Sequence, residues 1–204
     1  MNISKVFDNP NLYNLFQLAI VKSGTKDLLN SEILRDDVLE KILDFGCGIG
    51  HNSQLFSDKQ YIGIEPLESC VRAARRLYKD SRANFLIGDH TMLKLLPGAH
   101  FDLVFAIGVL HHIDDHVFRE FAKQAFRILK PGARLMTFDP VLHKQQSNLS
   151  KWLVRHDRGR WVRTESDYLA IINESFTGTT DSKIYSNLLR IPFDHILINK
   201  TKPF

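Results

Sequence analysis

The amino-acid sequence predicts an α/β protein built on a doubly wound sheet of mostly parallel strands. Short, nearly continuous apolar runs alternate with helical patterns along most of the chain, which is the pattern of such sheets. The chain has 204 residues, of which 44% are hydrophobic and 25% charged. These values are ordinary for a globular protein, and the length is enough for one domain with a sizeable core.

Five apolar runs predict the first strands of the sheet. They cover residues 41–45, 61–64, 84–88, 101–108 and 133–138. Because each run is short and almost continuous rather than strictly alternating, it suits a parallel strand that is covered on both faces. Two later runs, in KIYSNLLR and FDHILIN, predict two final strands with a turn near Ile191 and Pro192.

Helical patterns fill the intervals between these runs. Apolar residues recur at helical spacing over 70–78 and, more clearly, over 117–129. We expect the second of these helices to be capped by Asp114 or Asp115 and to stop before Pro131. Residues 12–39 predict one or two helices within an N-terminal helical cap (1–40), and 165–173 predicts another helix. No linker divides the chain, so we expect a single domain over 1–204, with the polar stretch 141–164 as an insertion on the substrate side.

Composition limits the compartment and the partners. The apolar runs are far shorter than the roughly 20 residues that span a bilayer, and the N-terminus lacks an apolar signal core. We therefore expect a cytoplasmic protein without a membrane partner. Two cysteines, Cys47 and Cys70, are too few for a disulfide framework and are expected to be reduced thiols. The net charge of +4 raises the question of nucleic acid, but the basic residues are spread along the chain.

The strongest motif is ILDFGCGIG at 42–50, where a strand enters a glycine-rich turn. Gly46, Gly48 and Gly50 let the backbone turn sharply and approach a ligand closely. The spacing is G-x-G-x-G, not the G-x-G-x-x-G of dinucleotide sites, because position 51 is His51. Asp44, just before the loop, is a poor neighbour for a pyrophosphate and a better one for an amino group. The loop therefore disfavours an NAD-dependent oxidoreductase.

Two further acids end the next two predicted strands. Glu65 follows Asp44 by 21 residues and is placed to accept hydrogen bonds from both hydroxyls of a ribose, in NAD and S-adenosylmethionine (SAM) alike. Asp89, in IGDH, is placed to accept a hydrogen bond from an adenine amino group. Both positions predict an adenosine-containing cofactor.

Taken in order, these motifs resemble the class I SAM-dependent methyltransferases, close to the small-molecule methyltransferases. LDFGCGIG, IGIEP, GDH, FDLVFAIGVLHHIDD and LKPGARLM occur in the order of that family over residues 41–139. The stretch HDRGRWVR, with the LHHIDD loop, is similar to a bacterial subset whose substrates are unknown. The resemblance implies a Rossmann-like, mostly parallel seven-stranded sheet with a C-terminal antiparallel strand. It also implies SAM as cofactor, S-adenosylhomocysteine (SAH) as product, and in-line methyl transfer to a small molecule.

The same resemblance assigns residues to the cofactor. Asp44 would lie near the ammonium of SAM, Glu65 at its ribose and Asp89 at its adenine amino group. Backbone after the fourth strand would lie near the amino acid end, Pro66 would pack on the adenine, and the first helix would fold over the cofactor. The full cofactor set is Asp44, Gly46, Cys47, Gly48, Glu65, Pro66, Asp89, His90, Ala106, Ile107, Tyr13 and Gln17. For Cys47 the simplest interpretation remains a small buried hydrophobe.

Candidate catalytic residues follow the fourth and fifth strands, at the edge of the sheet where ligands bind. His111 or His112 could act as general base toward a hydroxyl acceptor, although loop capping and packing are the alternative interpretation. Asp139 could orient the substrate or cap a loop. The histidines and the neighbouring aspartates are nearly consecutive, so their side chains point in different directions and no metal site is predicted.

Basic residues of the polar stretch are candidates for substrate contact. Arg158, Arg160 and Arg163 could hold an anionic group, because arginine binds carboxylates and phosphates through two parallel hydrogen bonds. A solvated loop is the alternative interpretation.

Two other functions compete with small-molecule methylation. The computed pI of about 9.1 favours an RNA methyltransferase. Against it, the chain lacks interleaved aromatic and basic residues and an N/D-P-P-Y/F tetrapeptide. A binding module that keeps the fold without the activity is the second alternative. The presence of Gly46, Gly48, Glu65 and Asp89 counts against it, because the expected set of cofactor residues is intact.

Overall fold

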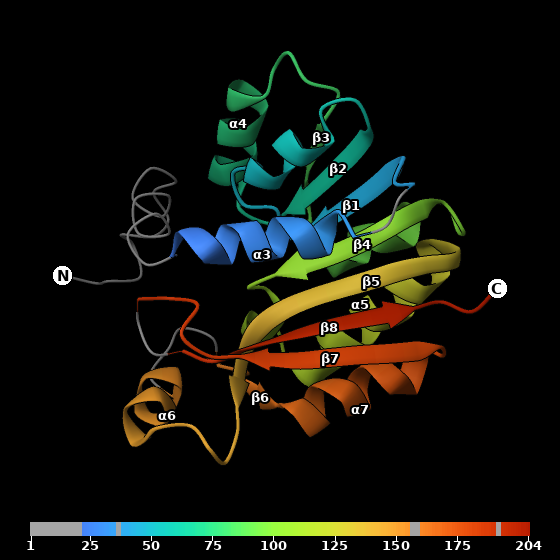
Figure 1. Ribbon diagram of the computed structural model, residues 1–204. Helices are drawn as coiled ribbons and strands as arrows, with labels where there is room; N and C mark the ends of the chain where they lie inside the picture. The colour runs from blue at the N-terminus through green and yellow to red at the C-terminus, as the bar shows by residue number, and fades with distance from the viewer. Residues whose placement is uncertain (1–21, 36–37, 156–159, 191–192) are drawn as a thin grey trace.

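One continuous sheet organises the molecule. The computed structural model describes residues 22–35, 38–155, 160–190 and 193–204. Seven strands lie in the order β3-β2-β1-β4-β5-β8-β7 (Figure 1). Their bounds are β1 Lys41–Phe45, β2 Gln60–Glu65, β3 Asn84–Ile87, β4 Phe101–Ile107, β5 Leu129–Leu142, β7 Thr179–Tyr185 and β8 His195–Thr201. A two-residue strand, β6 (Arg163–Thr164), pairs with the end of β5.

The strand directions confirm the predicted fold class. Strands β1 to β5 run parallel, while β8 runs antiparallel to β5 and β7 antiparallel to β8. Strand β1 lies between β2 and β4, so the chain winds outward in one direction through β2 and β3 and then resumes on the other side of β1. Such a reversal opens a crevice at the carboxyl ends of the central strands, where ligands of these sheets bind.

Helices cover both faces of the sheet. The α-helices are α3 Ser23–Ile33, α4 Glu68–Leu77, α5 Asp115–Ile128, α6 Asn148–Arg155 and α7 Glu165–Ser175; the 3₁₀ turns are η1 His51–Phe56, η2 His90–Leu95 and η3 Leu110–His112. Alternate residues of a strand face opposite sides. Leu103 and Phe105 of β4 pack in one apolar layer with residues of α3 and α4, and Val104 packs in the other with residues of α5 and α7. The nearly continuous apolar runs are thus explained by burial on both faces.

Helix α5 carries the clearest pattern in the sequence. Asp114 is its N-cap and accepts a hydrogen bond from the backbone N–H of Val117 at 2.8 Å, which confirms one of the two predicted caps. Phe118, Phe121 and Ala125 are fully buried and lie on one side of the helix. This apolar stripe holds α5 against the sheet, and the first turn of α5 therefore lies close to the end of β4.

Strand β5 is longer than the sequence predicts. It begins at Leu129 and ends at Leu142, whereas the apolar run covers only 133–138. The pairing with β4 shifts between Phe101, which is opposite Leu129, and Leu103, which is opposite Arg134. Pro131 and Gly132 lie within this irregularity, where the ladder tolerates a proline and a positive φ of 75° at Gly132. The proline therefore marks a bulge in the strand and not only the end of a helix.

The stretch 141–164, predicted as a polar insertion, contains the end of β5, helix α6 and the two-residue strand β6. Within the predicted N-terminal cap, α3 is the element that the structure describes. Tyr13 and Gln17 lie outside the described residues. Among the helices that are described, none has the length and apolar character needed to cross a bilayer.

Candidate active site

The glycine-rich loop connects β1 to the 3₁₀ turn η1. Gly46, Gly48 and Gly50 all have positive φ, at 77°, 54° and 80°. A Cβ atom on Gly46 would lie 2.3 Å from Cγ2 of Val109, and one on Gly50 would lie 2.5 Å from the ring of Phe85. Both positions therefore require glycine for two reasons, backbone conformation and close packing.

Asp44 lies beneath this loop, not in the wall of a cavity. Its side chain is 1% exposed and accepts hydrogen bonds from the hydroxyl of Tyr61 and, at 3.1 Å, from Nδ2 of Asn52. Burial raises the pKa of Asp44 from its usual 3.8 to about 7, although these two hydrogen bonds oppose the rise. The structure thus shows Asp44 joining β1 to β2 and to the turn η1 that follows the glycine loop, and its contact with an ammonium group stays a prediction.

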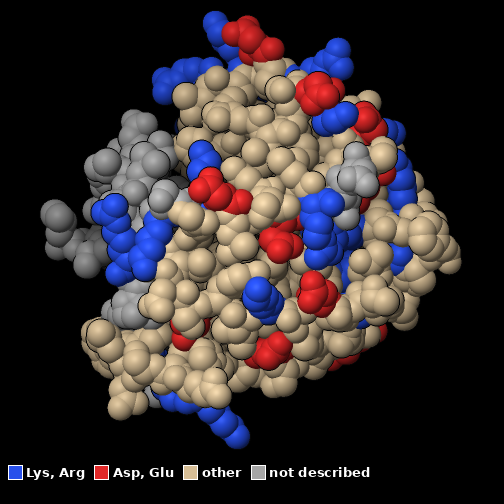
Figure 2. Space-filling model, viewed as in Figure 1, with Lys and Arg blue, Asp and Glu red and all other residues tan. Residues whose placement is uncertain are grey.

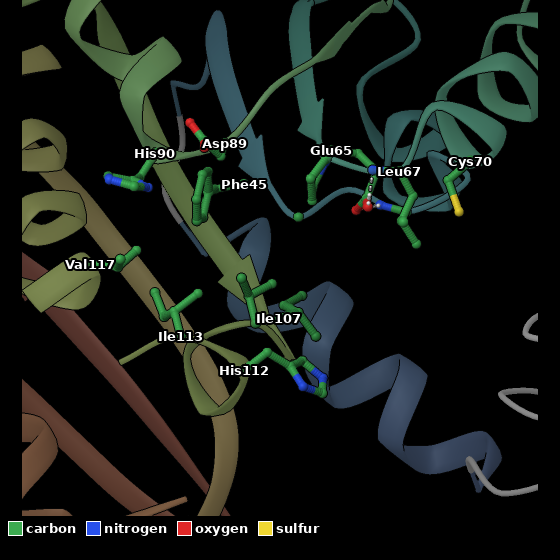
Figure 3. A pocket seen from close by; sticks show the side chains of 15 residues that line it. Phe45, Glu65, Leu67, Cys70, Asp89, His90, Ile107, His112, Ile113 and Val117 are labelled. Atoms are coloured by element: carbon green, nitrogen blue, oxygen red, sulfur yellow. Dashed lines mark hydrogen bonds between the residues drawn. The ribbon is translucent and has the colours of Figure 1, made fainter. Parts of the chain in front are cut away.

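Glu65 ends β2 and links the two segments beside it. Its Oε2 accepts a hydrogen bond from the backbone N–H of Gly48 at 3.2 Å, and its Oε1 accepts one from Leu67 at 3.0 Å (Figure 3). Burial raises the pKa of Glu65, and the two backbone hydrogen bonds partly offset this. A carboxylate has about four acceptor sites, so Glu65 can accept further hydrogen bonds from a ligand.

A cavity of about 410 Å³ lies at the carboxyl ends of the central strands. Most of its lining is apolar or glycine, and its ionisable groups are two carboxylates, one thiol and two imidazoles. Among the residues that the structure describes, no Lys or Arg lines the cavity. The lining residues are Phe45, Gly46, Gly48, Glu65, Pro66, Leu67, Cys70, Asp89, His90, Ile107, Gly108, Val109, His112, Ile113 and Val117. In Figure 3, His112 and Ile107 lie at one end of the view, away from Asp89 and His90.

Asp89 is held by the turn that follows it. Its Oδ1 accepts hydrogen bonds from the backbone N–H of Thr91 at 2.9 Å and from the Thr91 hydroxyl at 2.6 Å. These hydrogen bonds lower the pKa of Asp89, which is exposed. The carboxylate is therefore ionised at neutral pH and fixed at the edge of the cavity.

Most of the predicted cofactor residues lie in the cavity wall. Those found there are Gly46, Gly48, Glu65, Pro66, Asp89, His90 and Ile107. Cys47 and Ala106 are not lining residues; they are 7% and 0% exposed and pack in the core. For Cys47, burial agrees with the simpler interpretation of a small hydrophobe.

Sequence reasoning missed several apolar lining residues. Leu67 and Cys70 follow Glu65, and Val109, Ile113 and Val117 follow β4. Their sequence signal is only that they are apolar residues in or beside loops at the carboxyl edge. From the sequence alone, the same residues fit the apolar stripe of a helix equally well. The signal therefore becomes useful only once the positions of the strands are known.

The two adjacent histidines have different environments. His112 is exposed and lines the cavity, whereas His111 is 6% exposed and is not a lining residue. Nδ1 of His111 lies 2.8 Å from Oδ1 of Asp139, which also accepts the His111 backbone N–H at 3.3 Å. The two imidazole rings are in contact and tilted, with centroids 3.9 Å apart and 41° between the ring planes. Asp139 therefore fixes His111, and His111 supports the ring of His112.

This arrangement corrects two of the predicted catalytic roles. His111 and Asp139 are buried behind His112, so neither can contact a molecule in the cavity in this conformation. Asp139 also lies inside β5, opposite Ile196 of β8, and does not close the strand. Of the three candidates, His112 is the one whose residue lines the cavity.

The predicted role of Arg163 is wrong. Arg163 is 6% exposed, and its guanidinium binds Asp115 and three backbone carbonyls, so it has no donor left for an anionic substrate. Arg160 is exposed, and Arg158 lies outside the described residues. In the described ranges, no group of three or more His, Cys, Asp or Glu side chains is arranged to hold a metal ion.

Comparison with known proteins identifies the part of the chain that builds this site. The family model for the methyltransferase domain matches residues 42–132. This segment of the chain is similar to the methyltransferase domains of that family. It contains the glycine loop, Glu65, Asp89 and the two histidines, and therefore nearly all of the cavity wall.

Curated relatives of the methyltransferase domain agree over the same half of the chain. The 27-O-demethylrifamycin SV methyltransferase of Amycolatopsis mediterranei is 39% identical over 112 residues, which is 50% of this chain and 39% of that protein. The 2-methyl-6-phytyl-1,4-hydroquinone methyltransferase of Synechocystis is 34% identical over 104 residues, 48% of this chain and 31% of that protein. The chain thus spans less than two fifths of the length of these relatives.

Solved structures share the Rossmann-like fold over most of the chain. The YcgJ protein of Bacillus subtilis has a TM-score of 0.70 at 15% identity and covers 90% of this chain and 100% of its own. Phosphoethanolamine N-methyltransferase 2 of Haemonchus contortus, solved with SAM, has a TM-score of 0.70 at 15% identity; the match covers 89% of this chain and 52% of that one. At this identity the likeness concerns the fold, and it includes the strands beyond residue 132.

Proposed function

We propose that this chain is a SAM-dependent methyltransferase that acts on a small molecule. The observation that carries the proposal is a cavity at the switch point between β1 and β4. In the described part of the chain, its wall holds Glu65 and Asp89 but no Lys or Arg. SAM carries a sulfonium and an ammonium, so an acidic wall suits it. A pyrophosphate would need the opposite charge, which disfavours a dinucleotide.

The residues of the wall suit the parts of SAM in a definite order. Glu65 accepts the ribose hydroxyls, because it ends β2 and retains acceptor sites beside its two backbone hydrogen bonds. Pro66 packs on the adenine, and Asp89 accepts a hydrogen bond from the adenine amino group. Gly46 and Gly48 leave room for the methionine part, with the carboxylate of Asp44 beneath the loop.

The cofactor would supply an electrophilic methyl group on a positively charged sulfur. This chain aligns the acceptor with the methyl–sulfur bond and excludes water, through the apolar side chains of Ile107, Val109 and Ile113. When the acceptor is a hydroxyl, His112 takes its proton as the oxygen–carbon bond forms and the carbon–sulfur bond breaks. The bonding electrons stay on the sulfur of SAH, and the proton stays on the imidazole. His111, held by Asp139, keeps the His112 ring in place.

The acceptor is a small molecule with an apolar body. The names of the curated relatives describe methylation of a rifamycin and of a phytyl hydroquinone. The lining of the cavity around His112 is apolar. An anionic group on the acceptor, if present, is left with Arg160 as its described candidate contact, because Arg163 is already saturated.

RNA as the acceptor is the weaker candidate. On the face shown in Figure 2, Lys and Arg side chains are interspersed with Asp and Glu. Among the described residues in this view there is no continuous basic surface that would follow a phosphate backbone. This face of the molecule therefore gives no support to an RNA acceptor.

Calorimetric titration with SAM, SAH and NAD tests the cofactor. We expect micromolar binding of SAM and SAH and no binding of NAD. If neither SAM nor SAH binds, with or without acceptor candidates present, the enzymatic proposal is refuted.

The acceptor is then sought by measuring SAH release from a panel of hydroxylated aromatic and polyketide compounds, with total RNA as a separate sample. In the presence of an active acceptor, His112→Gln should lower the rate by about 100- to 10,000-fold while SAM binding is unchanged. The matched control is His116→Gln, an exposed histidine of α5 outside the cavity wall, which should leave the rate unchanged. Activity on RNA alone would refute the small-molecule acceptor.

A further inference from the structure

Arg163 uses every one of its side-chain donors. Nε donates to Oδ1 of Asp115 at 2.9 Å, and Nη2 donates to the same oxygen at 2.8 Å and to the carbonyl of Ile113 at 2.8 Å. Nη1 donates to the carbonyls of Leu110 at 2.8 Å and Trp161 at 3.0 Å. With five N–H groups and five hydrogen bonds, the guanidinium is fully satisfied in a site where it is 6% exposed.

Two of the carbonyls that bind Arg163 lie on either side of the histidine pair in the sequence. Leu110 and Ile113 are the residues immediately before and after His111 and His112, so Arg163 holds both ends of this turn at once. A further hydrogen bond joins the backbone N–H of Trp161 to the carbonyl of His111 at 3.1 Å. The turn between β4 and α5 is thereby fastened to the segment that leads into β6.

Aromatic packing fixes the plane of the guanidinium. The centre of the Arg163 guanidinium lies 5.1 Å from the ring centroid of Phe118 and 5.7 Å from that of Tyr168. Both rings are fully buried, one on α5 and one on α7. Since the ring positions are set by the core, the direction of the five hydrogen bonds is set as well.

We propose that Arg163 is a positioning residue that holds the turn of His111 and His112, so that the imidazole of His112 faces the cavity. The proposal rests on the proposed function, in which His112 is the general base. Arg163 contacts neither cofactor nor acceptor and acts only through the turn. Because the same side chain binds the carbonyl of Trp161, a displacement of the segment before β6 would be transmitted to His112.

Lysine cannot replace arginine in this role. A single ammonium has three donors on one atom and cannot reach Leu110, Ile113 and Asp115 in their separate directions. The Arg163→Lys variant keeps the charge and most of the volume but releases at least one end of the turn. An effect of this variant on His112 therefore reports the lost hydrogen bonds to the turn and not the loss of a positive charge.

Arg134 provides a matched control. It is 2% exposed and donates to Asn199 at 2.7 Å and to the carbonyls of Glu32 and Ile33 at 3.0 and 3.2 Å. These three partners lie on α3 and β8, away from the histidine turn. Arg134→Lys should cost stability as Arg163→Lys does, without affecting His112.

The test is an NMR measurement on the imidazoles. The Cε1–Hε1 signal of His112 is assigned by its loss in His112→Gln and followed with pH in the wild-type chain and both lysine variants. In Arg163→Lys we expect a displaced His112 signal and an altered titration midpoint, because the contact between the His111 and His112 rings loosens. In Arg134→Lys the His112 signal should coincide with that of the wild type. Urea unfolding of each variant shows how much stability has been lost.

A His112 signal in Arg163→Lys identical to that of the wild type would overturn the proposal, whatever the loss of stability. If Arg163→Lys does not fold, Asp115→Asn replaces it; this variant weakens two of the five hydrogen bonds at a half-exposed partner and should displace the signal in the same direction. An unchanged signal there would equally refute positioning. The NMR measurement requires neither SAM nor an acceptor. If SAM bound neither the wild type nor the variants, the proposed function would be refuted, while the positioning role of Arg163 would still be decided by the His112 signal. Once an acceptor is known, Arg163→Lys should lower kcat and leave the KM for SAM unchanged.

Discussion

Replacing Asp44 by asparagine should remove a pH dependence from the stability of the fold. The Asp44 carboxyl is enclosed beneath the glycine loop, and burial raises its pKa to about 7. In the unfolded chain the same carboxyl would titrate near its usual value of 3.8. The folded state therefore binds the proton of Asp44 more tightly than the unfolded state does.

The sign and the size of the effect follow from this difference. A raised pKa in the folded state gives a contribution to stability that is complete below about 3.8 and is lost as the pH rises through about 7. Between pH 5 and pH 7 the loss is about 1.4 kcal/mol per pH unit, so the free energy of unfolding should fall by roughly 3 kcal/mol by pH 8. Asparagine can still accept the hydrogen bonds of Tyr61 and Asn52 but carries no titrating proton.

The assay is urea unfolding, followed by tryptophan fluorescence at pH 5, 6, 7 and 8 in one buffer series. The quantity of interest is the difference between the wild type and Asp44→Asn, since every other titrating group is common to both. We expect the two chains to be closest in stability at pH 5 and the variant to gain on the wild type up to pH 8. Parallel curves across this range would show that Asp44 is ionised in the folded protein at all these pH values, and the burial argument would be wrong.

Three further predictions concern the cavity. Glu65→Gln should weaken SAM binding about 10- to 100-fold in calorimetry, because it removes a charged acceptor. The control Glu68→Gln, on the exposed start of α4, should leave SAM binding unchanged. If Glu65→Gln binds SAM as tightly as the wild type does, Glu65 is not part of the site. Gly46→Ala should lower the free energy of unfolding by at least about 1–2 kcal/mol, whereas Gly24→Ala, with open space around its Cβ position in α3, should be neutral or slightly stabilising; similar unfolding curves for both variants would contradict this. Because burial raises the pKa of Glu65, SAM should bind more tightly at pH 8 than at pH 6, and the reverse order would count against an ionised carboxylate in the wild-type site.

The strands of the sheet were predictable because each is a local pattern. Residues 41–45 form β1 with the bounds that the apolar run predicts, and 101–108 form β4 to within one residue. The ends of β5 were not predictable in this way. Its first residues pair with β4 across a bulge and its last residues pair with β6 and β8, and neither contact leaves a local signal.

The cofactor side of the site was predictable for a similar reason. Gly46, Gly48 and Glu65 each follow directly from the end of a strand, so a motif read along the chain also places them in space. The side chains of Cys47 and Ala106 are absent from the cavity wall because neighbours in a loop or strand point to opposite sides, and one of each pair enters the core. The predicted role of Ala106 concerns its backbone and stays a prediction.

The acceptor side depends on contacts between distant parts of the chain, and there composition misleads. Arg163 occurs in a basic stretch, which predicts an anionic ligand, yet four of its five hydrogen bonds go to acceptors 48 to 53 residues earlier, around the turn after β4. His111 and Asp139 are 28 residues apart and meet only because β4 and β5 are neighbours in the sheet. A charged residue that the fold buries is satisfied by whatever carbonyls and carboxylates surround it. Its sequence neighbours then say little about its role, and the positions that hold His112 in the cavity become visible only in the folded chain.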